Sequence, residues 1–326
     1  MAAKKTPALI AHGGAGGRAP ANERPARRRA MIAAIESGAQ LLRHGGHALD
    51  AVVATVMSLE DDPLFNAGYG SVLTTEGRVE MDAGVMVAEP AERNAAAGSC
   101  AALAKIRAGG VVLVSRVRNP IQLARAVMER TPHLLMGGAG AERLARDAGI
   151  RLCRPDQLIS ERARQRWLAL MENRASAALA DRHGTVGAVA VDAGGNVAAA
   201  TSTGGVSGKM PGRIGDSAIL GAGLFADARG GASATGSGEA IMRTALCRDV
   251  VAMSARMRAY DAAARVIADL HAGTGAEAGL VMVDAGGRFG YAHNAAAMEV
   301  AMFDGSGIRH LVVEPLRVRL EARNRD

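Results

Sequence analysis

Residues 183–205 read HGTVGAVAVDAGGNVAAATSTGG, two apolar runs on either side of a glycine turn at 193–195. Short apolar runs of this kind, separated by a turn signal, predict a β-hairpin. The expected ladder pairs Asp192 with Asn196, and a two-residue loop would shift the pairing by one position. The ends of the two strands then carry the polar residues of the stretch, and these give the hairpin its chemical interest.

The predicted register places Thr185 opposite Thr203, directly after Gly184. A threonine hydroxyl is a weak nucleophile that needs a nearby base, and an N-terminal threonine has one in its own α-amino group. That amine has an ordinary pKa of about 7.7–8.0, which suits proton transfer near neutral pH. It would form only by cleavage of the Gly184–Thr185 bond, and the glycine lets the backbone bend for that attack. Taken alone, the pattern favours an ordinary hairpin in which threonines satisfy β-propensity.

Two charged residues follow on a loop rich in Gly and Pro. Residues 211–216 read PGRIGD and place Arg213 and Asp216 three positions apart. An arginine fork suits a carboxylate, and an aspartate suits an ammonium group. The pair therefore matches the charged end of an amino acid, although a surface ion pair is the simpler explanation of the same spacing.

A third motif, TGSGE at 235–239, comes just before a helix-like run. A hydroxyl and exposed backbone N–H groups at the start of a helix form an anion site, which in an enzyme would serve as an oxyanion hole. A plain helix cap with flexible glycines is the alternative. Each motif alone favours the structural explanation, and their combination favours the catalytic one.

Taken together, these motifs resemble the plant-type asparaginase and isoaspartyl peptidase family of N-terminal-nucleophile hydrolases. The order and spacing of GTVGAVAVD, TSTGG, PGRIGD and TGSGE are highly specific. The resemblance covers nearly the whole chain. It runs through AHGGAGG at 11–17, DPLFNAGYGSVLTTEGRVEMDAGVM at 62–86, RNPIQLARAVME at 118–129, PHLLMGGAGAE at 132–142 and the block 184–239.

The resemblance implies that the chain cuts itself. Thr185 would be the nucleophile and the first residue of a β chain, 185–326, released from an α chain, 1–184. The polar, Arg-rich segment 154–184 is expected to be a mobile linker before the cut. Thr203 would hydrogen-bond the nucleophile and tune it.

The resemblance also implies the remaining roles in the site. Arg213 would hold the substrate α-carboxylate and Asp216 its α-amino group, which the carbonyl of Gly238 would also bind. The Thr235 hydroxyl and the Gly236 N–H would form the oxyanion hole. Asn66 would reach the site from the α chain. A structural sodium would bind backbone carbonyls of the loop 59–69, and the candidate ligands are Leu59, Glu60, Asp62, Phe65, Ala67 and Tyr69.

The expected fold is a single α/β domain over 1–326. The resemblance implies four layers, α-β-β-α, in which helices cover both outer faces of two stacked sheets. The short repeat of a strand, a DAGG turn and a strand at 280–294 matches the design of the central hairpin. Asp261 is a plausible N-cap of the last helix. The predicted strands lie at 7–12, 70–88, 111–116 and 218–227, and the predicted helices at 24–44, 47–60, 119–130, 139–148, 238–256 and 260–272.

Composition fits this fold without adding specificity. The chain has 326 residues, 49% of them hydrophobic and only 2% aromatic, so its core must be built mainly from aliphatic side chains. Three widely spaced cysteines give no disulfide or metal pattern, which suits a reducing compartment. No apolar run is long enough for a membrane span, and no signal peptide is evident, so a cytoplasmic location is expected.

The net charge of +7 raises the question of nucleic-acid binding. The excess consists mainly of arginines in helix-like runs, and few aromatics are available to stack bases, so solvated helix faces are expected instead. A dinucleotide fingerprint is weakly matched where Gly14, Gly16 and Ala19 follow the first predicted strand. Pro20 and Pro25 interrupt the helix that should come next.

The sequence therefore predicts a hydrolase that needs no cofactor for catalysis and acts on the side-chain amide of L-asparagine, of β-aspartyl dipeptides, or of both. The resemblance implies an (αβ)₂ homodimer. A catalytically silent homologue, or one selective for another aspartyl amide, is the alternative, and a nucleotide-binding enzyme is a distant one. The stretch 99–117 and Ala295 depart from the family pattern, and the loop at Ala295 is expected to flank the substrate pocket.

Overall fold

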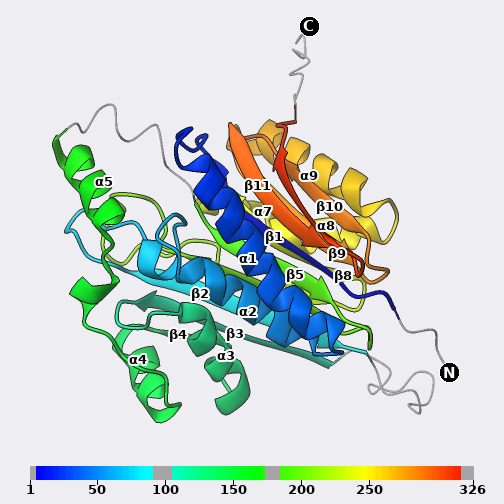
Figure 1. Ribbon diagram of the computed structural model, residues 1–326, viewed down its shortest axis with the longest axis horizontal. Coiled ribbons are helices and arrows are strands. Elements are labelled where there is room, and N and C mark those ends of the chain that lie inside the picture. The colour runs from blue at the N-terminus through cyan, green and yellow to red at the C-terminus, as the bar shows by residue number, and fades with distance from the viewer. Residues whose placement is uncertain (1–4, 91–104, 173–183, 317–326) are drawn as a thin grey trace, which may run out of the picture.

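The computed structural model describes residues 5–90, 105–172 and 184–316, which fold as a mixed α/β structure (Figure 1). The larger sheet has the strand order β12-β11-β1-β5-β6-β2-β3-β4, and the smaller has the order β10-β9-β8-β7. The strands of the larger sheet are β1 Ala8–Gly16, β2 Met81–Glu89, β3 Lys105–Val114, β4 Leu135–Gly137, β5 Val186–Val191, β6 Val197–Thr203, β11 Ala297–Phe303 and β12 Ile308–Val313. Those of the smaller sheet are β7 Leu224–Asp227, β8 Gly230–Gly236, β9 Ala278–Asp284 and β10 Phe289–His293.

Helices pack on both sheets. They are α1 Arg24–Arg43, α2 Ala48–Glu60, α3 Pro120–Arg130, α4 Gly138–Asp147, α5 Glu161–Glu172, α7 Gly238–Thr244, α8 Leu246–Ser254 and α9 Ala259–Thr274. Helices α1, α2 and α3 contact the larger sheet, whereas α8 and α9 contact the smaller one. Figure 1 shows α1 and α2 side by side, well apart from α8 and α9. The apolar faces of these five helices are thus buried against strand surfaces.

The core lies in three hydrophobic clusters that follow this packing. One joins the first helices to the larger sheet, as at Ile35 and Leu59, and one joins α8 and α9 to the smaller sheet. The third lies between the two sheets, where Ile10 and Val189 meet Val283. Alanine and valine dominate β5 and β6, which are buried along their whole length. Small side chains on both faces let this hairpin sit at the centre of the molecule.

The β5–β6 hairpin has the predicted register. Val186 pairs with Ser202 and Val191 with Val197, so Thr185 and Thr203 stand opposite each other at its open end. At the closed end, Asp192 organises the turn, because its Oδ1 accepts hydrogen bonds from the Gly194 and Asn196 amides at 2.9 and 3.0 Å. Its Oδ2 accepts from the Ala48 amide at 2.9 Å, which ties the turn to the first residue of α2.

The second predicted hairpin also forms, from β9 and β10. Asp284 repeats the turn chemistry of Asp192, with its Oδ1 accepting from the Gly286 and Arg288 amides at 2.8 and 3.0 Å. Its Oδ2 accepts from the exposed Arg288 side chain at 2.7 Å and contacts no helix terminus. The two DAGG turns are therefore locally alike and differ only in their tertiary partner.

The segment 154–184 differs from the predicted linker. A 3₁₀ helix covers Pro155–Leu158, and α5 covers Glu161–Glu172. Helix α5 is fixed to the body because Arg162 pairs with Glu23 at 2.5 Å and the Trp167 indole N–H donates to the Thr74 carbonyl at 2.9 Å. The rest of the predicted linker, 173–183, lies outside the described residues.

Other boundaries also need correction. The Asp261 N-cap is wrong, since α9 begins after Arg258 and Asp261 lies in the first turn, paired with that arginine at 2.7 Å. The predicted helix 238–256 breaks into α7 and α8 at Ala245, whose φ of 49° is left-handed. Strand β7 covers only the end of 218–227, and β2 only the end of 70–88. Part of 99–117 lies outside the described residues, and the rest supplies β3.

In the described ranges, no helix is both long enough and apolar enough to cross a membrane.

The two DAGG turns provide a matched test of what holds the hairpin in place. Asp192→Ala should lower the free energy of unfolding by about 2–3 kcal/mol, because it removes both a turn and a helix-end partner. Asp284→Ala should cost only about 1 kcal/mol, since its turn has no helix partner. Urea denaturation of both variants in a Thr185→Ala background, which keeps every protein a single chain, measures the difference. Equal losses would show that the contact with α2 contributes nothing.

Candidate active site

The two threonines that open the central hairpin are joined through their hydroxyls. Thr185 is 6% exposed, and its Oγ1 donates to the Oγ1 of Thr203 at 3.2 Å. Thr203 in turn donates to the Gly184 carbonyl oxygen at 3.1 Å and accepts from the Gly205 amide at 2.9 Å. One chain of hydrogen bonds thus runs from the Thr185 hydroxyl through Thr203 to the carbonyl that precedes Thr185.

Asn66 supplies a second donor to the same carbonyl. Its Nδ2 donates at 2.7 Å to the Gly184 oxygen and at 2.7 Å to the Gly205 oxygen. Its Oδ1 accepts from the Val72 amide at 2.9 Å, so the orientation of the amide group is fixed on both sides. The Gly184 oxygen therefore accepts from Asn66 and Thr203 together. Two donors on one carbonyl polarise it and would stabilise negative charge developing on its oxygen.

Strand β1 passes over the Gly184–Thr185 peptide with no room for a side chain. At Gly14, where φ is +105°, an added Cβ would lie 3.1 Å from the Gly184 Cα and 3.3 Å from the Thr185 nitrogen. The ladder between β1 and β11 is irregular here, between His12 and Ala15. The sequence points to the glycines at 11–17 only through the family resemblance, which assigns them no role in the site. Consecutive glycines inside a strand are the sequence signal for such a close approach.

The dinucleotide interpretation of the same glycines is wrong. Strand β1 pairs antiparallel with both of its neighbours, β11 and β5. A dinucleotide fingerprint requires a parallel strand–helix–strand unit whose helix N-terminus faces the phosphates.

Arg213 and Asp216 line one small cavity together with Thr185, Thr203 and Gly236. The Arg213 fork is occupied by Glu239, at 3.0 Å from Nε and 2.9 Å from Nη2. Asp216 is only 4% exposed, and its Oδ2 has no hydrogen-bond partner in the described part of the chain. Burial raises the pKa of Asp216 to about 7, although the nearby Arg213 opposes this rise. The carboxylate that pairs with Arg213 is thus the half-exposed Glu239, and Asp216 has no cationic partner in direct contact among the described residues.

Thr235 and Gly236 end β8 beside the same strand, β1. The Thr235 Oγ1 accepts from the Ala15 amide at 3.1 Å, which leaves its own proton available to a further acceptor. Gly236 has a φ of +131°, and a Cβ there would lie 2.6 Å from the Ala278 Cα. Only glycine fits this position, and its N–H lies next in the chain to the Thr235 hydroxyl.

Gly238 is the first residue of α7 and touches the Arg–Asp pair. A Cβ at this position would lie 2.8 Å from Asp216 Oδ1 and 2.9 Å from Arg213 Nη2. Its lack of a side chain keeps space open beside both charged groups. Ala295 itself does not line this cavity, because it is 3% exposed and packs in the core between the sheets, whereas Ala297 lines a neighbouring cavity that borders Gly184.

A buried polar network behind Thr185 escaped the sequence analysis. The Nε2 of His12 lies 2.9 Å from the Ser233 Oγ, which lies 2.7 Å from the Thr201 Oγ1, and Thr201 donates to the Gly223 carbonyl at 3.0 Å. Burial lowers the pKa of His12 to about 3, against a smaller opposing effect of the Thr185 backbone. The histidine is therefore neutral at physiological pH. The sequence signal for this network is His12 next to the paired glycines at 13 and 14.

Three backbone carbonyls of the loop 59–69 lie close to Gly70. A Cβ at Gly70 would lie 2.0 Å from the Phe65 oxygen and 3.0 Å from the Asp62 oxygen, and the Gly70 amide donates to the Ala67 oxygen at 3.0 Å. Convergent carbonyl oxygens suit a hard cation. Among the described residues, no group of three or more His, Cys, Asp or Glu side chains is placed to hold a metal.

Glu60, at the start of this loop, is fully buried. Its Oε1 accepts from the Ser202 hydroxyl at 2.6 Å and from the Ile121 amide at 3.0 Å. Burial raises the pKa of Glu60 to about 8, against the smaller effect of these two donors. The side chain is therefore largely neutral at pH 7 and links α2 to β6 one residue before Thr203.

The fold and the site define a mixed α/β protein in which a buried threonine pair shares a cavity with an Arg–Asp pair. The chain belongs to the asparaginase family, whose sequence pattern matches residues 5–313. It is 43% identical over 246 residues to human isoaspartyl peptidase/L-asparaginase, an alignment that covers 74% of this chain and 75% of the relative. It is 40% identical over 308 residues to the isoaspartyl peptidase of Salmonella typhimurium, an alignment that covers 89% of this chain and 93% of that relative. It is 42% identical over 300 residues to the plant-type L-asparaginase of Pyrobaculum calidifontis, an alignment that covers 89% of this chain and 94% of that relative.

The raised pKa of Asp216 predicts how stability changes with pH. The folded state keeps a proton that the unfolded chain releases between about pH 4 and 7, so the free energy of unfolding falls across that range. Asp216→Asn cannot titrate, and its stability relative to the parent should therefore increase from pH 4.5 to pH 7.5. Urea denaturation at the two pH values measures this, with the exposed Asp147→Asn as control. A difference that is the same at both pH values would contradict the shift.

Proposed function

We propose that the chain is a self-processing threonine hydrolase that hydrolyses the side-chain amide of L-asparagine and of β-aspartyl dipeptides. The observation that carries this proposal is the hydrogen-bond chain from the Thr185 hydroxyl to the Gly184 carbonyl. It is supported by the relatives, which are named isoaspartyl peptidase or L-asparaginase. The Arg213–Asp216 pair supplies the charges that the common end of these substrates requires.

Self-cleavage begins with attack of Thr185 Oγ1 on the Gly184 carbonyl carbon. As the Oγ1–C bond forms, the Thr185 hydroxyl proton passes to Thr203 while Thr203 gives its own proton to the former carbonyl oxygen, which Asn66 Nδ2 also stabilises. Collapse returns that proton to the nitrogen as the C–N bond breaks, and the nitrogen becomes the Thr185 amine. Water then hydrolyses the remaining ester between Gly184 and the Thr185 oxygen. The products are an α chain, 1–184, with a new carboxylate, and a β chain, 185–326, with a new amine.

Substrate turnover reuses the same hydroxyl with a new base. The substrate α-carboxylate displaces Glu239 from the Arg213 fork, and its ammonium group pairs with Asp216, whose pKa falls as it does so. Thr185 attacks the side-chain carbonyl, and its amine takes the hydroxyl proton and delivers it to the departing amine. The Thr235 hydroxyl and the Gly236 N–H receive the oxyanion. Water then releases aspartate and restores the hydroxyl.

The architecture around this site fits the same class. The contacts of α1, α2 and α3 with one sheet, and of α8 and α9 with the other, support a four-layer α-β-β-α arrangement. A sodium ion held by carbonyls of the loop 59–69 would stiffen the segment that carries Asn66, a structural role outside the reaction. The functional unit in this proposal is an (αβ)₂ dimer of cleaved protomers.

Intact-mass spectrometry tests the cleavage directly. The parent protein should give two chains with a new N-terminus at Thr185, and Thr185→Ala should stay intact and inactive because it lacks the attacking hydroxyl. Thr185→Ser keeps a hydroxyl and should still cleave, more slowly, because serine lacks the second Cβ substituent that restricts rotation. Active parent protein with an unbroken Gly184–Thr185 bond would disprove the mechanism.

Arg213 should matter for turnover and not for cleavage. Arg213→Gln removes the fork for the α-carboxylate, a charge-assisted contact of about 1.5–3 kcal/mol, and should lower kcat/KM for asparagine by about 10- to 100-fold. Arg256 is an exposed arginine just after the end of α8, and Arg256→Gln serves as the matched control. Steady-state assays of the cleaved proteins measure both. Unimpaired turnover by Arg213→Gln would remove the residue from substrate binding.

A further inference from the structure

The leaving side of the substrate can be located from the position of the nucleophile's amine. That amine must protonate the departing nitrogen, so the two nitrogens lie within hydrogen-bond reach during turnover. In the intact chain the Thr185 nitrogen is bonded to the Gly184 carbonyl carbon. The leaving group of a substrate therefore lies next to the Thr185 nitrogen, and a cavity that borders Gly184 outside the Arg213–Asp216 cavity is the site that can hold it.

Gly184 does border a second cavity, distinct from the one that contains Arg213 and Asp216. This cavity has a volume of about 290 Å³ and is lined by Asn66, by the glycines at the end of β1 and by arginines of three segments. The arginines are Arg18, Arg27, Arg162 and Arg166, and the carboxylate among its lining residues is Glu299. Its wall is thus strongly cationic beside the reacting bond.

Not all of these arginines are available to a ligand. Arg27 contacts Glu299 at 3.2 Å and the Gly13 carbonyl at 3.2 Å, so its fork is committed to the protein. Arg162 is committed to Glu23. Arg18, by contrast, is exposed and makes no hydrogen bond or ion pair with any residue in the described ranges. Its guanidinium is the group in this wall that is open to an incoming anion.

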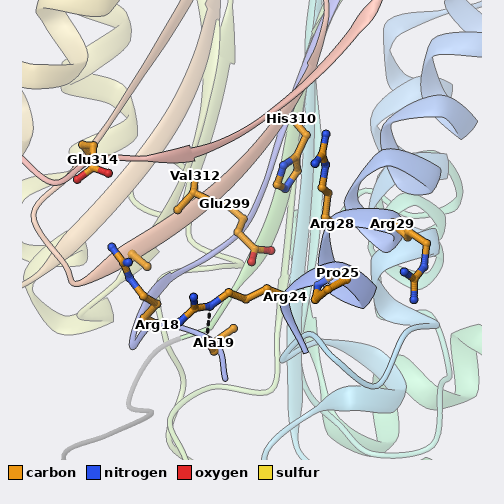
Figure 2. Close-up of a pocket in the computed structure, with 11 residues that line it drawn as sticks. Arg18, Ala19, Arg24, Pro25, Arg28, Arg29, Glu299, His310, Val312 and Glu314 are labelled. Atoms are coloured by element: carbon orange, nitrogen blue, oxygen red, sulfur yellow. Dashed lines mark hydrogen bonds between the residues drawn. The ribbon is translucent and has the colours of Figure 1, made fainter. Parts of the chain in front are cut away.

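A larger cavity of about 830 Å³, whose lining Figure 2 shows, adjoins this one. The two share Arg18, Ala19, Ala297 and Glu299. Arg24 and Arg28, from the start of α1, extend the basic wall, and Figure 2 shows Arg28 near His310. Elsewhere many arginines of the described chain pair with a carboxylate, as Arg125 does with Asp50. Arg27 and Arg162 also pair with glutamates, and Glu314 lines the larger cavity. Arg18, Arg24 and Arg28 have no carboxylate partner among the described residues, so the wall keeps an excess of positive charge.

We infer that this cavity is a leaving-group subsite in which Arg18 binds the carboxylate of the amino acid released from a β-aspartyl peptide. The inference rests on the proposed function and names its favoured substrate class. In a β-aspartyl dipeptide the leaving nitrogen and the free carboxylate are separated by a single carbon, so both reach one small cavity. Asparagine releases ammonia, which has no carboxylate and gains nothing from Arg18. The subsite thus favours isoaspartyl peptides with a free C-terminus over asparagine.

Three substrates of matched acyl part test this with cleaved enzyme: β-Asp-Leu, β-Asp-Leu amide and L-asparagine. The parent enzyme should show a kcat/KM about three- to fivefold higher for the free dipeptide than for its amide, the size expected of an exposed charge pair. Arg18→Gln should bring this ratio close to one, mainly through KM. Arg29 lines only the larger cavity, so Arg29→Gln should keep the parent ratio. High salt should reduce the parent ratio, because exposed charges are screened.

The outcomes separate the two proposals. Turnover by the parent enzyme with equal kcat/KM for the free dipeptide and its amide would overturn the subsite and leave the hydrolase intact. An Arg18→Gln enzyme that keeps the parent ratio would remove Arg18 from recognition and overturn the inference as well. Parent protein that is intact by mass and hydrolyses none of the three substrates would overturn the proposed function and the subsite together.

Discussion

The Thr203 hydroxyl is the contact on which the site depends. It accepts a hydrogen bond from the Thr185 hydroxyl and donates one to the Gly184 carbonyl oxygen, so it joins the hydroxyl to the carbonyl group that the proposed cleavage attacks. Three remote features serve this geometry. The register of β5 and β6 sets the threonines opposite each other, the loop after α2 delivers Asn66, and β1 approaches through a glycine. A hydroxyl has one proton and two lone pairs, and each is placed here.

A second constraint is the burial of charge beside the threonines. Asp216 lies in a site that opposes its ionisation, and Arg213 holds a glutamate that is itself mostly exposed. A free amino acid brings both missing charges at once, an ammonium for the aspartate and a carboxylate for the arginine. In the proposed function the zwitterion pairs with Asp216 through its ammonium group and with Arg213 through its carboxylate, in place of Glu239. This pairing concerns the part of the substrate that asparagine and β-aspartyl peptides have in common.

The two sides of the reacting bond differ in character. The acyl side is tight, with glycines at 236 and 238 where no side chain fits. The side of Gly184 is roomier and cationic, and it opens toward the start of α1. Tight walls suit the invariant aspartyl part of a substrate, whereas a wider basic space suits a leaving group of variable side chain and constant carboxylate. The proposed leaving-group subsite would place selectivity among aspartyl amides on this side, in residues that no local motif marks.

Much of this protein was determined by its sequence alone. The DAGG turns fix the register of both hairpins, because an aspartate binds the turn amides within a few residues of itself, and the pairing of Thr185 with Thr203 follows. Contacts between distant segments could not be predicted in this way. The donation of Asn66 to Gly184, the network of His12 with Ser233, the docking of α5 by Arg162, and the Glu239 partner of Arg213 each join residues far apart in the chain. Only tertiary packing brought them together, since the energy of a hydrogen bond or ion pair depends on distances that local sequence does not set.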